Sequence, residues 1–378
     1  MSKPVLILPG DPAPAFVQRS IANPRYVFAS AAGRYLVLAF LGSAADPHAQ
    51  AAVAAVRSRG DIFDDTHASF FGVSVDPADE AQQRVEDAYP GYRFLWDFDL
   101  SVSKLYGAVP PDAEPTAKGL RMRRMWVVID PTMRVLHVEP FREDRGDIVA
   151  VLDYLAQLPP PSRFAGVELQ APILMLPNVF EPAFCRRLID LYQARGGQES
   201  GFMREENGRT VLVNDHAHKR RRDVEVTDRG LIGELQARII RRVVPEIAKV
   251  HQFTVTRMER YLVACYSAAE GGHFRAHRDN TTKGTAHRRF AVSINLNAEF
   301  EGGEVSFPEY GPRGFKPPPG GAVVFSCSLL HQVSKVTAGE RYAFLPFLYD
   351  DAAAKIREEN IGYLGDGTAK YSAGVAAG

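Results

Sequence analysis

A run of three prolines, Pro159 to Pro161, divides this 378-residue chain into two parts with different patterns. The run follows an amphipathic stretch, GDIVAVLDYLAQL, that is typical of a helix. Consecutive prolines end a helix and form a stiff, extended connector. Because a chain of this length is too long for one ordinary core, we predict two domains, residues 1–160 and residues 161–378.

The overall charge and the cysteine content exclude several classes of protein. The formal net charge is zero, so the chain as a whole has no electrostatic bias toward nucleic acid or anionic membranes. No apolar run approaches the roughly 20 residues that span a bilayer, and we read no signal peptide at the N-terminus. Three widely spaced cysteines, Cys185, Cys265 and Cys327, fit a reducing compartment better than a disulfide scaffold. We therefore expect a cytoplasmic protein that binds neither nucleic acid nor membranes.

The first half alternates segments of strand and helix character. Continuous apolar runs such as RYLVLAFLG are typical of buried strands, and helical patterns lie between them. Two further strand patterns form a closing hairpin before the last helix. This order predicts an α/β sheet with helices on both faces. The expected strands are residues 34–42, 68–77, 123–131 and 134–141, and the expected helices are residues 48–63, 79–89 and 146–158.

Four segments of this half resemble landmarks of the peroxiredoxin branch of thioredoxin-like folds: GDPAPAF, FFGVSVDP, FLWDFDLSVSKLYGA and RMWVVIDPTMRVLHV. The resemblance covers about residues 4–158. That family carries its peroxidatic cysteine just after the first core strand, where this sequence reads LGSAADPHAQ. The first half contains no cysteine, and only a thiolate performs that chemistry. We therefore predict a thioredoxin-like domain without peroxidase activity. We expect His48, near the vacated position, to lie at the surface.

The second half places helices first and short strands afterwards. Helical patterns cover residues 181–197 and 229–251, and strands with Gly-rich and Pro-rich turns follow. This order predicts an α+β domain, a double-stranded β-helix or jelly roll with supporting helices. Residues 204–228, between the two helices, are too long and polar for a simple connector, so we expect a lid or substrate loop. Its basic cluster, Lys219 to Arg222, fits a solvated charge run and a docking patch for an acidic substrate equally well.

A candidate metal site begins in the stretch GGHFRAHRDN. His277 and Asp279 are two residues apart, so in an extended segment their side chains point to the same face. His331, on a later strand, is the third candidate, and two histidines with one carboxylate form the facial triad of non-haem Fe(II) oxygenases. Arg341, ten residues further, can form a bidentate pair with a carboxylate such as that of 2-oxoglutarate. The alternative is a structural ion pair at Arg341 and a core histidine at position 331.

Two more histidines lie in the same stretch. We assign His273 to the rim of the site, because the glycines before it bend the chain. His287 precedes two arginines at a turn, and we expect it to be exposed.

This half resembles the prolyl 4-hydroxylase family of Fe(II)/2-oxoglutarate dioxygenases, most closely the hypoxia-inducible-factor type, over residues 172–350. The segments that carry the resemblance are VACYSAAEGGHFRAHRDN, INLN, GGEVSFPE and HQVSKVTAGERYAF. It implies that Arg341 binds the 5-carboxylate of 2-oxoglutarate and that Tyr266 contacts the co-substrate. Two positions differ from that group. Asn295 stands where the group has a tyrosine that touches the co-substrate. Tyr266 lies one residue further from the His277–Asp279 pair than the matching tyrosine does in the group. The iron ligands that the resemblance implies are His277, Asp279 and His331.

The function implied by the resemblance is Fe(II)-, 2-oxoglutarate- and O₂-dependent hydroxylation, with succinate and CO₂ as co-products and ascorbate as a candidate supporting reductant. The substrate would be an amino-acid residue or an amino-acid-like molecule, so the expected partner is a peptide, a protein or such a molecule. We favour packing and homodimerisation over substrate delivery as the role of the first domain. Two alternatives stay open: hydroxylation of a small metabolite, and a non-catalytic redoxin-type scaffold or binding protein.

Overall fold

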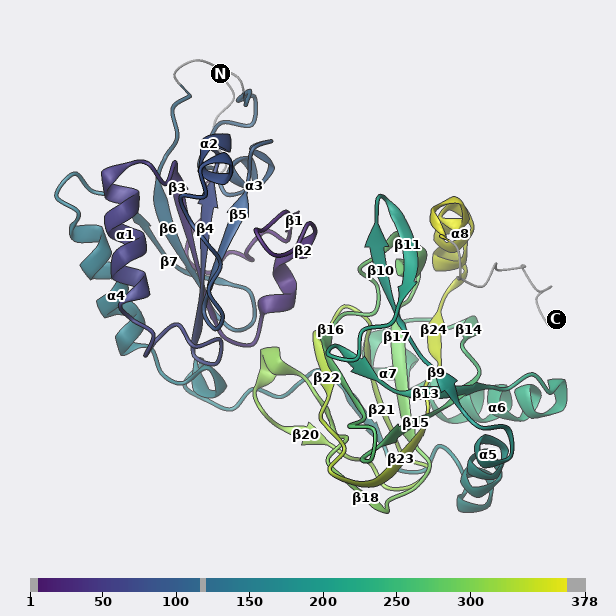
Figure 1. Ribbon diagram of the computed structural model, residues 1–378. Helices are drawn as coiled ribbons and strands as arrows, with labels where there is room; N and C mark the ends of the chain where they lie inside the picture. Colours follow the sequence, from purple (N-terminus) through teal and green to yellow (C-terminus); the bar gives the residue numbers. More distant parts are fainter. Residues whose placement is uncertain (1–5, 116–119, 366–378) are drawn as a thin grey trace. The chain divides into compact units, whose positions relative to one another are not determined.

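The computed structural model describes residues 6–115 and 120–365 (Figure 1). The chain divides into two compact units, Met1–Gln170 with Pro308–Pro312, and Ala171–Phe307 with Arg313–Gly378. The predicted domain boundary, between residues 160 and 161, lies shortly before this division. Within the two described ranges, none of the helices combines the length and the apolar composition that crossing a bilayer requires.

The first unit is built on a five-stranded sheet in the order β5-β4-β3-β6-β7. Strands β3, β4 and β5 are parallel, whereas β6 and β7 form the predicted antiparallel hairpin. Nearly every residue of β3 and β4 is buried, which is why their sequences are continuous apolar runs. The strands of this unit are β1 (Val17–Gln18), β2 (Tyr26–Val27), β3 (Tyr35–Gly42), β4 (Ala68–Ser74), β5 (Tyr92–Trp96), β6 (Met125–Ile129) and β7 (Val135–Pro140).

Helices cover this sheet unequally. The long helices α1 (Pro47–Arg57) and α4 (Gly146–Gln157) pack on one face over a cluster of buried side chains that includes Trp126 (Figure 1). The opposite face is covered by the N-terminal segment, which contains the 3-10 helix η1 (Phe28–Ala31), and by the short helix α3 (Ser101–Leu105). The thioredoxin-like architecture predicted from the sequence is therefore present.

Two helices of this unit are shorter than predicted. α1 ends at Arg57, and α2 (Pro77–Ala81) ends at Ala81 although the helical pattern extends to residue 89. Gln83 has a φ of 49°, in the left-handed region, which a continuing helix does not allow. The next residue, Arg84, then reaches back with its guanidinium to Asp79, 2.8 Å away. Neither the left-handed residue nor the pairing that follows it can be detected from hydrophobic periodicity.

The second unit contains two main sheets in a jelly-roll arrangement without a closed barrel. The smaller has the strand order β12-β16-β22-β19-β20, and the larger runs β14-β24-β17-β23-β15-β13-β9, with β8, β18 and β21 attached. The strands are β8 (Leu174–Leu176), β9 (Gln198–Glu199), β12 (Lys219–Arg220), β13 (Arg222–Glu225), β14 (Arg257–Glu259), β15 (Leu262–Ser267), β16 (His273–His277), β17 (Phe290–Asn295), β18 (Phe300–Glu301), β19 (Val305–Ser306), β20 (Gly314–Phe315), β21 (Ala322–Ser326), β22 (His331–Val333), β23 (Ala338–Phe344) and β24 (Phe347–Tyr349).

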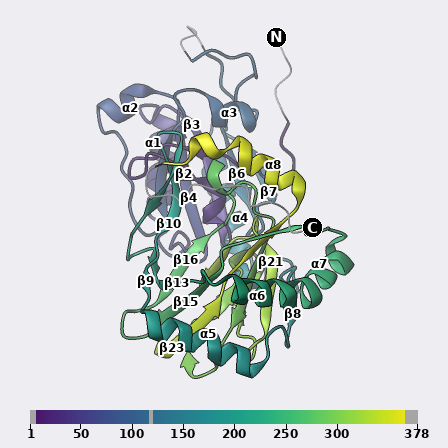
Figure 2. The same ribbon diagram turned by 90° about the vertical axis from the view of Figure 1, so that its right-hand side faces the viewer.

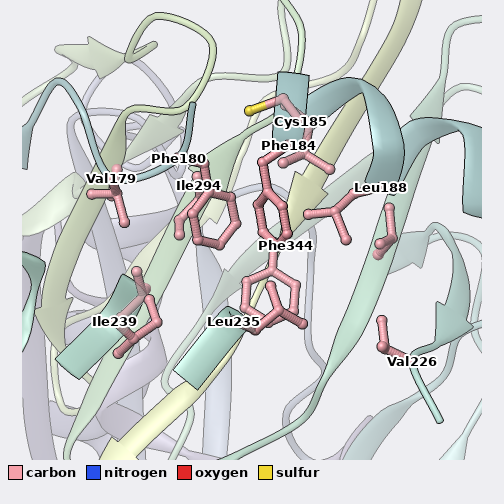
Figure 3. Packing of buried hydrophobic residues seen from close by; sticks show 14 of the residues in the cluster. Val179, Phe180, Phe184, Cys185, Leu188, Val226, Leu235, Ile239, Ile294 and Phe344 are labelled. Atoms are coloured by element: carbon pink, nitrogen blue, oxygen red, sulfur yellow. The ribbon is translucent and has the colours of Figure 1, made fainter. Parts of the chain in front are cut away.

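Helices buttress the larger sheet, and the core of the unit lies between them and the strands. Phe184 and Leu188 from α5 (Pro182–Arg195) meet Leu235 from α6 (Arg229–Arg242) and Ile294 and Phe344 from the sheet (Figure 3). Figure 2 shows α5, α6 and α7 along this face. The other helices of this unit are α7 (Val244–His251), α8 (Asp351–Glu359) and the 3-10 turns η3 (Lys283–Thr285) and η5 (Ile361–Tyr363). The 3-10 turns η2 (Pro161–Arg163) and η4 (Pro308–Tyr310) belong to the first unit.

The single long helix predicted at residues 229–251 is two helices. α6 ends at Arg242 and α7 begins at Val244, with Pro245 in the first turn of α7. Proline has no N–H to donate and its ring collides with the carbonyl four residues earlier, so the ladder of hydrogen bonds must restart there.

The polar segment at residues 204–228 is largely strand rather than loop. β10 (Phe202–Glu206) and β11 (Arg209–Val213) form an antiparallel hairpin, and β12 and β13 follow. Whether this hairpin covers a substrate stays a prediction.

Candidate metal centre and anion pocket

The three predicted metal ligands meet at the end of β16. His277, the last residue of β16, pairs in register with His331, the first residue of β22, after a bulge in the ladder. Asp279 follows two residues later, and its backbone N–H donates to the carbonyl of Cys327 at 3.0 Å. One candidate ligand atom from each of the three side chains lies within 4.8 Å of the others. The Asp279 carboxylate is 3.3 Å from Nε2 of His331 and 3.6 Å from Nε2 of His277.

Hydrogen bonds to the backbone fix both imidazole rings. Nδ1 of His277 lies 2.7 Å from the carbonyl oxygen of Arg275, and Nδ1 of His331 lies 3.0 Å from that of Leu329. A carbonyl only accepts, so each Nδ1 carries the proton and each Nε2 presents its lone pair to the centre of the cluster. Phe274 stacks on the His277 ring with 3.5 Å between centroids.

The electrostatics of the cluster keep His277 neutral and Asp279 ionised at neutral pH. Burial, together with the neighbouring His331, lowers the pKa of His277 to about 4. Burial by itself raises the pKa of the Asp279 carboxyl, but the adjacent His331 and His277 outweigh it and hold that pKa well below its usual range. A neutral imidazole and an ionised carboxylate are the forms that bind a metal ion.

Arg341, on β23, is buried without a counter-ion. It is 1% exposed, its Nε donates to Oδ1 of Asn295 at 3.0 Å, and its Nη2 donates to Oγ of Ser293 at 2.7 Å. Both partners are neutral, and within residues 6–115 and 120–365 no carboxylate forms an ion pair with it and its Nη1 has no hydrogen-bond partner. Burial lowers the pKa of this guanidinium. Arg341 thus brings a buried positive charge and an unused donor into the pocket that the His277–Asp279–His331 cluster also lines, and an anion could satisfy both.

The two other residues assigned to the co-substrate differ in their positions. Tyr266 lines the same pocket, and its ring centroid lies 5.3 Å from the guanidinium carbon of Arg341. Its hydroxyl accepts a hydrogen bond from Nη1 of Arg221 at 3.3 Å. Asn295 points its oxygen at Arg341 and donates from Nδ2 to the carbonyl of Pro317 at 2.9 Å. In this arrangement Asn295 orients Arg341.

The basic cluster of residues 219–222 is not the solvated charge run that was one of its two predicted readings. Lys219 and Arg221 are 5% and 6% exposed, whereas Arg222 is exposed. Lys219 donates from Nζ to Oγ of Ser200 at 2.8 Å, and Arg221 pairs with Asp223. The alternation of buried and exposed residues is that of an extended chain, and this period could have been read from the sequence.

The pocket contains two arginines that the sequence interpretation missed as site residues, Arg221 and Arg260. Arg221 belongs to the basic cluster described above. Arg260 lies between β14 and β15. An isolated arginine in a strand pattern gives no sequence signal of a site.

The three other histidines considered in the sequence analysis, His48, His273 and His287, lie outside the cluster. His273 is half-buried with Nδ1 2.8 Å from the carbonyl of Gly271. The prediction that His287 is exposed is wrong: it is 2% exposed, and its Nε2 lies 3.0 Å from Oε2 of Glu259. The prediction of a surface position for His48 is also wrong. It is 8% exposed at the start of α1, because its Nε2 finds the buried carboxylate of Asp147 at 3.0 Å.

Both halves match known family models. Residues 261–349 match the model of the 2OG-Fe(II) oxygenase superfamily, and residues 9–138 match that of the AhpC/TSA family. These are the two resemblances expected from the sequence. The first family name also specifies Fe(II) and 2-oxoglutarate, the predicted cofactors.

A curated relative is a PKHD-type hydroxylase from Nitrosomonas europaea, 32% identical over 107 residues, which are 25% of this chain and 47% of the relative. This chain thus spans about half the length of that protein. Among solved structures, a prolyl hydroxylase from Trichoplax adhaerens, in complex with a hypoxia-inducible-factor peptide fragment, shares 18% identity at a TM-score of 0.39, covering 50% of this chain and 86% of that one. The peroxidoxin BcpB of Mycobacterium tuberculosis shares 21% identity at a TM-score of 0.34, covering 40% of this chain and 99% of that one.

Proposed function

We propose that this chain is an Fe(II)- and 2-oxoglutarate-dependent dioxygenase that hydroxylates an amino-acid residue or an amino-acid-like substrate. The observation that carries the proposal is that one pocket holds a cluster of two histidines and a carboxylate together with a buried arginine that lacks a carboxylate partner. The oxygenase family model over residues 261–349 supports the same reading. A structural ion pair at Arg341, the alternative considered from the sequence, has no acid to form it among the described residues.

The donor set fits Fe(II). His277 and His331 offer Nε2 atoms that their Nδ1 bonds keep free of protons, and Asp279 offers an anionic oxygen. Two imidazoles and a carboxylate leave one face of an octahedral ion for further ligands. The backbone bond from Asp279 to Cys327 holds the carboxylate in place beside both rings.

The arginine fits the distal carboxylate of 2-oxoglutarate. Ser293 and Asn295 occupy Nη2 and Nε of Arg341 and leave Nη1 to donate to the bound carboxylate. Tyr266 packs beside the guanidinium and closes that side of the pocket. When bound, iron and 2-oxoglutarate together activate O₂, with succinate and CO₂ as co-products. The chain's own part is to hold and orient both groups.

The proposal is tested first without a substrate to be hydroxylated. The purified protein is incubated with Fe(II), 2-oxoglutarate and O₂, and succinate is measured. We expect slow succinate formation that stops when either Fe(II) or 2-oxoglutarate is left out. If the iron-loaded protein forms no succinate in the presence of 2-oxoglutarate and O₂, the alternative of a non-catalytic scaffold is favoured.

The substrate is then sought by mass spectrometry. Peptide libraries and cell extracts are incubated with the active protein, and products that gain one oxygen atom are identified. Asp279→Ala is the matched control, because it removes the anionic ligand at a side chain that is little exposed. We expect no oxygenated product with that variant.

A further inference from the structure

The pocket contains more positive charge than its proposed ligands use. Three guanidinium groups line it, from Arg221, Arg260 and Arg341, and among its described lining residues Asp279 is the single carboxylate. In the proposed function Asp279 binds the metal and Arg341 binds the co-substrate. The two remaining arginines therefore need separate explanations.

Arg221 is neutralised by a neighbour on its own segment. Its Nε and Nη2 each lie 2.7 Å from a different carboxylate oxygen of Asp223, a bidentate pair that uses both oxygens. Its Nη1 donates to the hydroxyl of Tyr266 at 3.3 Å. All of these bonds are made within the protein, so Arg221 positions Tyr266 and has little left to offer a ligand.

Arg260 has no comparable partner. Its closest acidic contact is Oδ2 of Asp223, 3.7 Å from Nη2, and that oxygen already accepts from Arg221 at 2.7 Å. The guanidinium carbon lies 5.3 Å from the ring centroid of Phe347. Across the described part of the chain, the Arg260 side chain makes no hydrogen bond. The side chain is 29% exposed, so its donors remain accessible from the pocket that it lines.

The backbone at Arg260 is unfavourable for an arginine. Its φ of 64° lies in the left-handed region, which residues with a Cβ adopt at a cost in free energy that glycine does not have. The residue separates β14 from β15, where a glycine would make the same turn. Strained positions that keep a charged side chain in a pocket point to a ligand rather than to stability.

We propose that Arg260 binds a carboxylate of the substrate that is hydroxylated. The inference rests on the proposed function and specifies its substrate class: an amino acid, peptide or similar molecule with a carboxylate close to the carbon that receives oxygen. One unmatched guanidinium corresponds to one negative charge, and its planar pair of donors matches a carboxylate. The carboxylate has three sources, namely the α-carboxylate of a free amino acid, the C-terminus of a peptide, and an acidic side chain.

The test measures binding near the metal without requiring turnover. The protein is loaded with Mn(II) and with N-oxalylglycine, an unreactive analogue of 2-oxoglutarate, and the paramagnetic relaxation of small probes is measured by NMR. Three matched pairs separate the sources: proline and prolinamide, acetyl-Ala-Pro as acid and as amide, and acetyl-Pro-Asp-amide and acetyl-Pro-Asn-amide. We expect stronger relaxation of the acid in at least one pair, and about tenfold weaker binding of that acid to Arg260→Gln.

Two further variants make the result interpretable. Arg257→Gln is the matched control, because Arg257 lies three residues away and its side chain pairs with Asp351. It should keep the preference for the acid. Arg260→Gly removes the cation but accommodates the left-handed backbone, so its unfolding temperature should not fall below that of the wild type while the acid preference is lost. This variant carries the test if Arg260→Gln does not fold.

Three outcomes overturn the inference while leaving the proposed function standing. In the first, the wild type relaxes acid and amide equally in every pair. In the second, Arg260→Gln or Arg260→Gly keeps the preference. In the third, Arg260→Gln loses N-oxalylglycine as severely as Arg341→Gln does, which would reassign Arg260 to the co-substrate. A wild type that binds no Mn(II) by electron paramagnetic resonance would refute the proposed function itself and this inference with it. Binding of Mn(II) and N-oxalylglycine without an acid preference refutes the inference alone.

Discussion

At the scale of single residues, the candidate site is defined by which polar atoms already form hydrogen bonds within the protein and which remain free for a ligand. Each metal-facing histidine uses its Nδ1 on a carbonyl two residues earlier in the chain, at Arg275 and Leu329. The orientation of each ring is therefore set by its own short segment, before the strands pair. Arg341 is the complementary case, because two of its nitrogens are held by neutral groups and the third is left over.

Replacing His331 tests the metal centre. His331→Ala removes one of three converging ligand atoms, so we expect the affinity for Fe(II) to fall by at least roughly tenfold. Loss of only an outer hydrogen bond to a metal ligand already lowers metal affinity by about that factor, and losing the ligand itself should cost more. Isothermal titration with Mn(II) or Fe(II) under anaerobic conditions measures the change. His273→Ala is the control and should keep its metal, because His273 lies outside the cluster. Equal affinities in the two variants would remove His331 from the site.

Replacing Arg341 tests the co-substrate site. Charge-assisted hydrogen bonds contribute roughly 1.5–3 kcal/mol each, so Arg341→Ala should weaken 2-oxoglutarate binding by about tenfold or more. Arg341→Lys keeps the charge but replaces the rigidly held guanidinium donor with a mobile ammonium group, so its affinity should lie between those of the wild type and Arg341→Ala. The KM for 2-oxoglutarate in succinate formation measures the effect, with metal affinity as the control. A KM unchanged in both variants contradicts the assignment.

At the scale of elements, strand pairing brings the site together, and this is the part that the sequence indicated best. The spacing of His277 and Asp279 requires only an extended chain, and the register of β16 with β22 then places His331 opposite His277. Arg341 lies on β23, directly beside Tyr266 on β15. These positions follow from the period of a strand and from the order of strands, both of which leave a trace in a sequence.

Residues whose environment depends on distant partners could not be predicted in this way. His287 is buried because Glu259, at the end of β14, also accepts from Arg288 and pairs with Arg357 of α8. The residues near His287 in the sequence give no indication that Glu259 lies beside it. The same holds for His48, whose partner Asp147 begins another helix 99 residues away. A histidine next to arginines is therefore predicted to be exposed unless the distant carboxylate that pairs with them is known.

Glu259 connects the segment around His287 to α8. Replacing it should lower the free energy of unfolding and change how that free energy depends on pH. Burial raises its pKa, but Arg288 and His287 outweigh burial and hold that pKa well below the usual range, while burial lowers the pKa of His287. In both cases the unfolded chain binds more protons than the folded one as pH falls, so the free energy of unfolding should decrease below pH 6.5, and further below about 4.5.

Urea unfolding followed by far-UV circular dichroism between pH 7 and pH 4 measures this dependence. Glu259→Gln should destabilise the protein at pH 7 by on the order of 3 kcal/mol, because Arg288 and His287 remain buried without their acid. Its stability should also depend less on pH below 4.5. An equally steep acid dependence in Glu259→Gln would show that other carboxylates dominate.

At the scale of the whole molecule, a redoxin-type unit without cysteine is joined to an oxygenase-type unit that contains all three. Burial raises the pKa of Cys185 to about 11 and that of Cys265 to about 12, and raises that of Cys327 well above its usual value. Thiolates are therefore scarce at neutral pH in both units. Homodimerisation through the first unit stays a prediction.

The 378-residue protein should accordingly not reduce peroxides. With hydrogen peroxide and a thiol reductant, we expect consumption at the rate of the reductant alone, measured by a colorimetric peroxide assay. A triple variant, Cys185→Ala with Cys265→Ala and Cys327→Ala, is the control and should behave identically. Peroxide consumption that disappears in the triple variant would assign a redox role to a cysteine of the second unit.

The chain has two tryptophans, Trp96 and Trp126, and both are buried in the sheet of the first unit. Tryptophan emission therefore comes from the half that is not expected to bind iron or 2-oxoglutarate. Ligands stabilise the unit that they bind by mass action, so adding Mn(II) and N-oxalylglycine should delay unfolding seen by circular dichroism and leave the tryptophan transition in place. A common delay in both signals would mean that the units unfold as one cooperative body. Tryptophan fluorescence therefore reports on the first unit alone, since the second unit contains no tryptophan.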